Sequence, residues 1–213
     1  ELDSQIPLQK RWSEPSRFQS PFPIGEGESA KGKSSVTLNW LLAPVDEPFR
    51  LLALELLSNI LIGRSGSPLQ KALVESGLGD DLSAPSGIES ELKEIVFSAG
   101  LRGTDPEREG DIESCIYNEL ERIRLEGFSK DLVEGTLRSV EFRNRELKGS
   151  PFGLRLMRRA MRGWIYGAAP ETCLEFRPYM DRVRDALSKN PRMFEELTER
   201  YLIDNPHRST VTI

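Results

Sequence analysis

The sequence is poor in the residues that most often carry catalysis or bind metals. It contains one histidine, His207, and two cysteines, Cys115 and Cys173, in 213 residues. A single imidazole excludes a metal site built on paired histidines, and a cysteine–histidine or serine–histidine relay would have to recruit that same residue. The two cysteines lie on separate segments without metal-type spacing. We therefore expect two free thiols rather than a disulfide, as in a reducing compartment.

Long apolar runs are also missing. Charges and glycines interrupt every stretch before it reaches the roughly 18 to 20 residues that span a bilayer, so we expect no membrane partner. The net charge of −5 gives no general attraction to nucleic acid, because such binding depends on Lys and Arg side chains that neutralise phosphates. The chain starts at Glu1 without a basic and apolar leader, which suits an excised fragment or a processed product. We expect an intracellular location, with no distinction between a bacterial cytoplasm and an organelle matrix.

Composition and pattern predict one folded domain after a polar connector. Hydrophobic residues make up 38% of the chain, enough for a sizeable core at this length. Residues 1–33 are polar, rich in Pro and Gly and without a sustained period. We interpret them as a connector in which Trp12 and Phe22 are held against the domain. Residues 34–213 are predicted to form a single α+β domain with a helical C-terminal portion.

The order of the predicted elements gives the fold class. Residues 35–43 alternate between apolar and polar side chains, as a strand with one buried face does. Asp46 is expected to cap a helix that has Pro48 in its first turn, ends near Ile62 and is apolar around nearly its whole circumference. The other predicted elements are a short helix opened by Ser67-Pro68 and ended by Gly77, strands at 82–88 and 92–101, long helices on either side of Gly127, shorter helices within 152–202 and a last strand from Thr210. This order is typical of a two-layer α+β domain with helices on one face of a mostly antiparallel sheet.

One segment matches a nucleotide-binding motif. Residues 27–34 follow the phosphate-binding P-loop pattern Gly-x-x-x-x-Gly-Lys-Ser. A P-loop follows a buried strand and opens a helix, so that its backbone N–H groups face the phosphates. Here Pro21 and Pro23 precede the motif and strand-like alternation follows it. We therefore interpret the match as accidental and the segment as an exposed loop; nucleotide binding through Lys33 is the alternative.

A basic stripe is predicted on the helix that follows residue 152. Four arginines recur there at helical spacing: Arg155, Arg158, Arg159 and Arg162. Four apolar residues line the opposite side: Leu154, Met157, Met161 and Ile165. Such a helix suits a solvated face, an interdomain contact or a contact with an anionic partner. We favour the solvated face or the interdomain contact over an anion site.

The remaining candidates for chemistry are expected to be structural. His207 follows Asn205-Pro206 at the start of the last strand, where we expect a surface or turn histidine rather than a metal ligand. Cys115 lies near Ile112 and Ile116 on the apolar side of a predicted helix, where it would be an inert core thiol. We predict no catalytic, cofactor-binding or metal-binding residue in this chain.

Short strings along nearly the whole chain occur in the order of one known family. The most specific match is Ser67-Pro68-Leu69, followed by Leu73 and then Glu75-Ser76-Gly77-Leu78-Gly79. The other strings occur in the family's order: Arg11-Trp12-Ser13-Glu14-Pro15, Val36-Thr37-Leu38-Asn39-Trp40-Leu41-Leu42, Gly100-Leu101-Arg102-Gly103-Thr104, Val140-Glu141-Phe142-Arg143 with Arg145-Glu146, Gly163-Trp164 and Asn205-Pro206-His207-Arg208. Through this co-linear order the chain resembles the presequence-protease branch of the pitrilysin/insulinase zinc metallopeptidases.

The resemblance implies a role without catalysis. It implies four homologous α+β domains in two halves, joined by a helical hairpin, that close around a chamber for unfolded peptides. The family's zinc lies in the first domain on a His-x-x-Glu-His motif, which this chain lacks. The chain resembles the second, non-catalytic domain of the N-terminal half, and alone we predict it to be inactive.

The resemblance also implies partners and a cofactor. The partners are the other domains of the same peptidase and, in the full-length enzyme, unfolded peptides. No cofactor is expected in this chain, and zinc is expected in the full-length enzyme. The alternative is a stand-alone, catalytically inactive relative that acts as a binding or assembly module.

Overall fold

The structure, a computed structural model that describes residues 5–145 and 151–213, confirms a two-layer α+β domain. One layer is a sheet with strand order β1-β6-β2-β5-β3, and β4 pairs with β5 beside that path. Neighbouring strands are antiparallel except β1 and β6, so the sheet is mostly antiparallel as predicted. The strands are β1 Ser16–Gln19, β2 Ser34–Pro44, β3 Asp81–Leu82, β4 Gly87–Glu89, β5 Glu94–Thr104 and β6 Arg208–Thr212.

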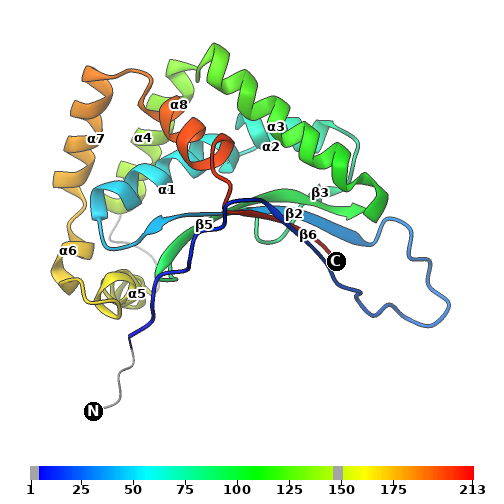
Figure 1. The fold of residues 1–213 in the computed structure, drawn as a ribbon. Helices are drawn as coiled ribbons and strands as arrows, with labels where there is room; N and C mark the ends of the chain where they lie inside the picture. The colour runs from blue at the N-terminus through cyan, green and yellow to red at the C-terminus, as the bar shows by residue number, and fades with distance from the viewer. Residues whose placement is uncertain (1–4, 146–150) are drawn as a thin grey trace.

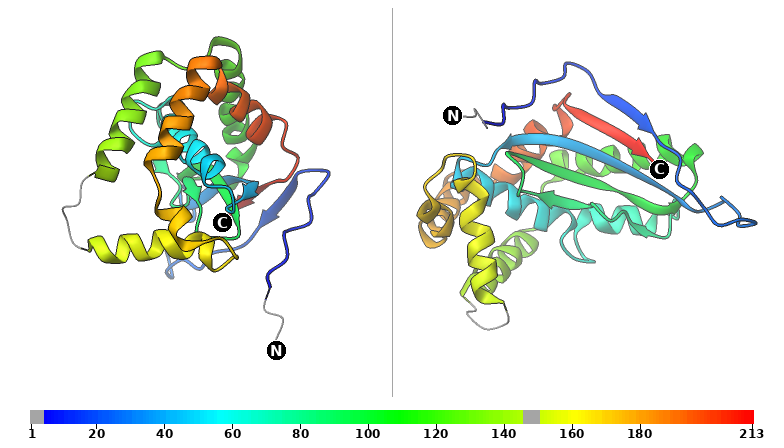
Figure 2. Two further views of the ribbon diagram at one scale, coloured as in Figure 1. Left: turned by 90° about the vertical axis from the view of Figure 1, so that its left-hand side faces the viewer. Right: turned by 90° about the horizontal axis from the view of Figure 1, so that it is seen from below.

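The helices form the second layer, and most of them cover one face of the sheet (Figure 1). They are α1 Pro48–Ile62, α2 Pro68–Glu75, α3 Glu109–Glu126, α4 Lys130–Arg145, α5 Phe152–Trp164, α6 Pro170–Leu174, α7 Arg177–Lys189 and α8 Met193–Thr198. A 3-10 turn, η1 Pro106–Arg108, precedes α3, and a π-helical turn, η2 Glu199–Ile203, continues α8. Seen from below, the strands lie in front of most of these helices, while α5 and α6 stand at one end of the domain (Figure 2, right).

Strand β2 shows why the sheet has one buried face. Val36, Leu38 and Trp40 point toward the helices and have no exposed surface. The Trp40 indole N–H donates a hydrogen bond to the Leu202 carbonyl at 3.0 Å, which ties the sheet to η2. Successive side chains of a strand point to opposite faces. The residues between these three, Thr37 and Asn39, therefore lie on the face that no helix covers. The alternation read from the sequence is therefore confirmed.

Helix α1 is buried on nearly all sides, as its apolar circumference predicts. It packs between the sheet and helices α4 and α7, and Leu56, Ile60 and Leu61 have no exposed surface. Pro48 occupies the first turn as predicted. Asp46 as the cap is wrong, because the N-cap residue is Glu47 and no side chain caps this helix. The fixed φ of proline therefore defines where the helix begins.

The segment expected to be a connector contains regular structure. Strand β1 pairs in parallel with β6 along its whole length, which the sequence analysis missed. Trp12 is held against the domain as predicted, but Phe22 as a second anchor is wrong, since it is 69% exposed. The division into residues 1–33 and 34–213 stays a prediction.

The predicted strand at 82–88 is also different in the structure. It is two short strands, β3 and β4, on either side of a turn in which the Ser86 N–H donates to the Ser83 carbonyl at 3.0 Å. Both short strands pair with β5, so the sheet order is unaffected.

Candidate functional site

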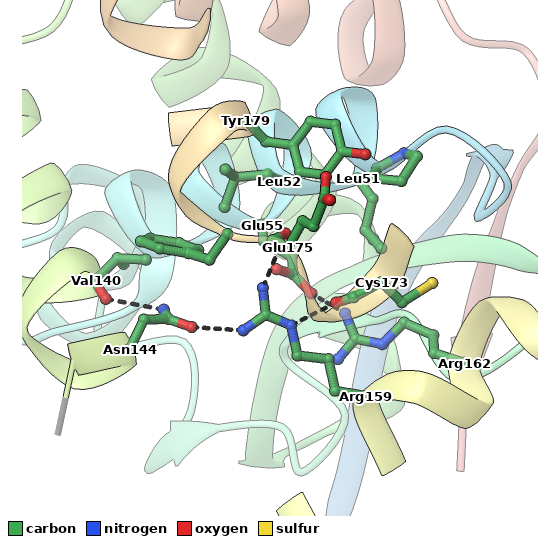
Figure 3. Close-up of a pocket in the computed structure, with 12 residues that line it drawn as sticks. Leu51, Leu52, Glu55, Val140, Asn144, Arg159, Arg162, Cys173, Glu175 and Tyr179 are labelled. Carbon is green, nitrogen blue, oxygen red and sulfur yellow. Dashed lines mark hydrogen bonds and ion pairs between the residues drawn. The ribbon is translucent and has the colours of Figure 1, made fainter. Parts of the chain in front are cut away.

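Helix α5 stands over a cleft that α1, α4 and α7 form in the body of the domain (Figure 3). The enclosed part of this cleft has a volume of about 150 Å³. Apolar residues of α1 and α4 line one side of the cleft: Leu51, Leu52 and Val140. Two arginines of α5, Arg159 and Arg162, line the side toward α5. Glu55, Asn144 and Cys173 complete the lining. We refer to this space as the α5 cleft.

Two ion pairs hold α5 on the body. Arg162 binds Glu55 of α1, and the two side chains are only 22% and 29% exposed. Arg158 binds Glu91, in the loop between β4 and β5, with 62% and 50% of the side chains exposed. Because water screens exposed charges, the first pair contributes more to the position of α5 than the second.

Arg159 makes its contacts with neutral acceptors. Its guanidinium donates to the Asn144 side-chain oxygen at 2.8 Å and to the Cys173 carbonyl at 2.7 Å (Figure 3). It also lies over the Phe176 ring, 5.6 Å from the centroid. Burial lowers the pKa of the Arg159 guanidinium from its ordinary value. This cation therefore links α5 to α4 and to the start of α7 without a carboxylate.

The close approach of α5 and α6 depends on a glycine. A Cβ placed on Gly163 would lie 2.6 Å from the Cys173 sulfur. A larger residue would therefore require Cys173, whose backbone carbonyl Arg159 uses, to shift. The predicted arginine stripe and Gly163 thus act together in fixing α5.

The structure brings the four predicted arginines to one helix face. Three of them, Arg158, Arg159 and Arg162, contact residues of the domain itself. The guanidinium of Arg155 lies over the Phe152 ring on its own helix, 5.5 Å from the centroid. An additional contact of these arginines with another domain or an anion stays a prediction.

The opposite face of α5 was missed as a candidate site. Leu154, Met157, Met161 and Ile165 are all exposed, and so is Trp164. The helical period separates the two faces of α5, but it does not say which of them points inward. The signal in the sequence was the apolar stripe itself, which was noted opposite the arginines but not proposed as a site.

His207 is buried, so the prediction of a surface histidine is wrong, although it does lie in the turn before β6. Its Nδ1 accepts a hydrogen bond from the Trp12 backbone N–H at 3.0 Å, and its ring stacks on the Trp12 indole. Within residues 5–145 and 151–213, no group of three or more His, Cys, Asp or Glu side chains could hold a metal ion. The described residues therefore do not form a zinc site like the one that the resemblance implies for a neighbouring domain.

The two thiols are free, as predicted. Cys115 is half-buried, and its thiol donates to the Ala72 carbonyl at 3.6 Å. Burial, and to a lesser extent Glu119, raises the pKa of the Cys115 thiol. A raised pKa leaves little thiolate at neutral pH, which fits an inert thiol rather than a nucleophile.

The segment with the P-loop pattern is an exposed loop that leads into strand β2, not into a helix. The Gly32 N–H donates to the Asp105 side chain at 2.6 Å, and the Lys33 ammonium pairs with Glu28. The Gly32 N–H and the Lys33 ammonium are thus engaged within the protein.

None of the helices in the described residues is long and apolar enough to cross a bilayer.

Comparison with known proteins identifies the fold. The family described as "Peptidase M16 inactive domain" matches residues 4–140. Presequence protease 1, chloroplastic/mitochondrial, of Arabidopsis thaliana is 34% identical over 98% of this chain and 20% of its own length. The peptidase M16 inactive domain of Pseudomonas fluorescens is 15% identical, with a TM-score of 0.62 over 98% of this chain and 45% of that chain.

A third protein shows the same fold within a longer chain. The periplasmic protease PqqL of Escherichia coli has a TM-score of 0.63 at 15% identity, over 99% of this chain and 22% of that chain. The present chain likewise spans about a fifth of the length of the curated relatives it matches. Because the family match covers more than half of the sequence, this chain belongs to the peptidase M16 inactive domains, and it is related to presequence proteases.

Proposed function

We propose that this chain is the non-catalytic second domain in the N-terminal half of a zinc metallopeptidase that degrades unfolded peptides. Membership of the M16 inactive domains carries this proposal. The engagement of the only histidine by Trp12 supports it, because no second imidazole is available for a metal. A domain without metal ligands contributes to a peptidase through its shape and its contacts.

The proposed role is to form part of the chamber wall. The helix-free face of the sheet supports this role, since small polar residues lie at its centre: Thr37, Asn39 and Ser98. The Ser98 hydroxyl donates to the Asn39 side-chain oxygen at 2.7 Å, which holds both groups in place. Small side chains give this face an even surface on which an extended peptide can lie.

The proposed partners are the other domains of the same polypeptide and unfolded peptides. One of those domains would carry zinc on a His-x-x-Glu-His motif. Support comes from the relatives, which are about five times as long as the region they share with this chain. We propose a bacterial cytoplasm or an organelle matrix as the compartment, supported by the chloroplastic/mitochondrial name of the Arabidopsis relative and by two free thiols.

A second candidate is a stand-alone, catalytically inactive module that binds or assembles other proteins. The exposed apolar face of α5 favours it, because such a face suits a partner. The two candidates differ in what the gene encodes beside this domain. A neighbouring His-x-x-Glu-His motif on a helix favours the peptidase.

The test is a peptidase assay on the full polypeptide encoded by the gene and on the 213-residue chain. Each is incubated with unstructured fluorogenic peptides, with and without a metal chelator. We expect chelator-sensitive cleavage by the full polypeptide and none by the chain. Chelator-sensitive cleavage by the chain alone would contradict the non-catalytic role. An inert full polypeptide would leave the binding module as the function.

A further inference from the structure

Helix α5 exposes an apolar stripe, whereas an ordinary surface helix buries its apolar stripe against the domain. Five apolar residues on this helix or directly after it are between 37% and 57% exposed: Leu154, Met157, Met161, Trp164 and Ile165. We refer to these five residues as the α5 stripe. Two arginines of the same helix, Arg159 and Arg162, point into the α5 cleft, and Arg158 reaches Glu91 beside it.

The orientation of α5 is fixed from the arginine side. Arg162 binds Glu55, Arg158 binds Glu91, and Arg159 reaches Asn144 on α4. A rotation of α5 that buried the stripe against its own domain would break all three contacts. It would also separate Gly163 from Cys173, where the two helices meet without room for a Cβ. The stripe is therefore held outward by the fold.

Further exposed apolar side chains lie along the same end of the domain. The loop at residues 91–93 contacts α5 through Arg158 and accepts a hydrogen bond from the Tyr166 hydroxyl at the Glu91 carbonyl, at 3.2 Å. On its other side, the Lys93 ammonium donates to the Ile6 carbonyl. Leu92 in this loop and Ile6 and Leu8 beside it are all more than half exposed. A large exposed apolar patch on a globular domain marks an interaction surface.

Three occupants of this surface differ in their chemistry. A helix that lies on an anionic membrane keeps its basic residues free for lipid headgroups, whereas Arg158 and Arg162 are already paired with carboxylates of the domain. A second copy of this chain would place two identical stripes together. Another domain of the same polypeptide is favoured by the relatives, because in PqqL and in the Arabidopsis presequence protease the shared region makes up about a fifth of the chain.

We propose that the α5 stripe, continued by Leu92, Ile6 and Leu8, is the surface on which another domain of the same polypeptide docks. This inference rests on the proposed function and names the interface that the function requires. Two methionines at its centre, Met157 and Met161, adapt to the shape of an apolar partner surface. The arginine contacts behind the stripe keep it presented to that partner.

Hydroxyl-radical footprinting tests the proposal, because Met and Trp side chains are oxidised when water reaches them. The full polypeptide and the 213-residue chain are labelled in parallel. We expect several-fold lower oxidation of Met157 and Trp164 in the full polypeptide. Phe142 on α4, which is also exposed, is the control and should be labelled equally in both proteins. Equal labelling of Met157 and Trp164 in the two proteins would overturn the proposal.

A charge-introducing variant gives an independent readout. In the full polypeptide, Met157→Lys with Met161→Lys should restore oxidation of Trp164 to the level seen in the 213-residue chain. Leu125→Lys, at an exposed apolar position on α3, should leave Trp164 protected. Both variants place lysine on exposed helix surface, and circular dichroism of the 213-residue chain verifies that each folds. Continued protection of Trp164 in the double variant would count against the interface.

The other occupants give distinct results. Dimerisation of the 213-residue chain in light scattering, abolished by the methionine double variant, would assign the surface to a second copy and overturn the proposal. Sedimentation of the chain with phosphatidylserine vesicles, abolished by the same variant, would assign it to a membrane and also overturn it. The peptidase assay is separate: an active full polypeptide with an unprotected stripe refutes the interface alone, and a protected stripe in an inert polypeptide refutes the peptidase alone.

Discussion

The indole of Trp12 lies flat against the imidazole of His207, with the ring centroids 4.4 Å apart and the planes inclined by 7°. The Trp12 backbone N–H donates to Nδ1 of the same imidazole at 3.0 Å. The contact joins residues that are 195 positions apart and fixes the segment that leads to β1. Because Nδ1 accepts a hydrogen bond, His207 is neutral in this arrangement, with its proton on Nε2.

The first prediction concerns pH. Burial, followed by the charge of Arg11, lowers the pKa of His207 from its ordinary value of 6.5. Below pH 6.5 the unfolded chain thus binds more protons than the folded chain, and the free energy of unfolding decreases as the pH falls toward the folded pKa. The contribution is fully present above pH 6.5. NMR titration of this single histidine, beside chemical denaturation at pH 7 and pH 5.5, measures both effects.

His207→Gln is the control, because it removes the titrating group. The difference in unfolding free energy between the two pH values should be smaller in this variant than in the unmodified chain. A His207 pKa at or above 6.5 in the folded protein would contradict the assignment of a neutral, hydrogen-bonded imidazole.

The second prediction concerns two glycines with opposite roles. A Cβ added to Gly100 of β5 would lie 2.0 Å from the Val36 carbonyl oxygen on β2, so backbone would have to move. Gly135, within α4, has nothing within 4 Å of such a Cβ. We expect Gly100→Ala to lower the free energy of unfolding by at least about 2 kcal/mol, as overpacking does, and Gly135→Ala to raise it by about 0.5–1 kcal/mol through helix propensity. Urea denaturation decides, and equal effects of the two substitutions would refute the close contact between β2 and β5.

The third prediction concerns the pair that anchors α5. Arg162→Met leaves Glu55, which is 29% exposed, without its cation. We expect a loss of about 1–2 kcal/mol of unfolding free energy, between the values for exposed and buried pairs. Lys189→Met removes the exposed partner of Asp185 and should change stability by less than about 0.5 kcal/mol. Similar losses for the two variants would show that Arg162 does not anchor the helix.

These contacts separate what the sequence could predict from what it could not. The alternation of Val36, Leu38 and Trp40 identifies a strand and its buried face, because the period of a strand is a local property. Pro48 marks the start of α1 for the same reason. Asp46 failed as a cap because proline and tertiary packing already define that helix start, so the carboxylate is not needed there.

The failures elsewhere involve partners that are distant in the chain. We expected His207 at the surface or in a turn, but Trp12 stacks on its ring. We expected a connector where β1 pairs with β6. The arginine stripe was recognised, but its inward direction depends on Glu55 and Glu91, which belong to other elements. A helical period gives the two faces of α5 equally well, and only the acceptors in the α5 cleft choose between them.

The last prediction concerns the loop with the P-loop pattern. Gly32 adopts a φ of +67°, and its backbone N–H donates a hydrogen bond to the Asp105 carboxylate at 2.6 Å. A bound phosphate would need this same N–H, which the carboxylate already occupies. We expect no ATP binding by the chain or by its Lys33→Ala variant. We also expect Lys33→Ala to change the free energy of unfolding by no more than about 0.5 kcal/mol. Asp105→Ala should instead cost about 1–2 kcal/mol, because the Gly32 N–H loses a charge-assisted hydrogen bond. Calorimetry with ATP and urea denaturation measure these outcomes. ATP binding that Lys33→Ala abolishes would restore the nucleotide-binding interpretation, because the lysine of a P-loop reaches the phosphates.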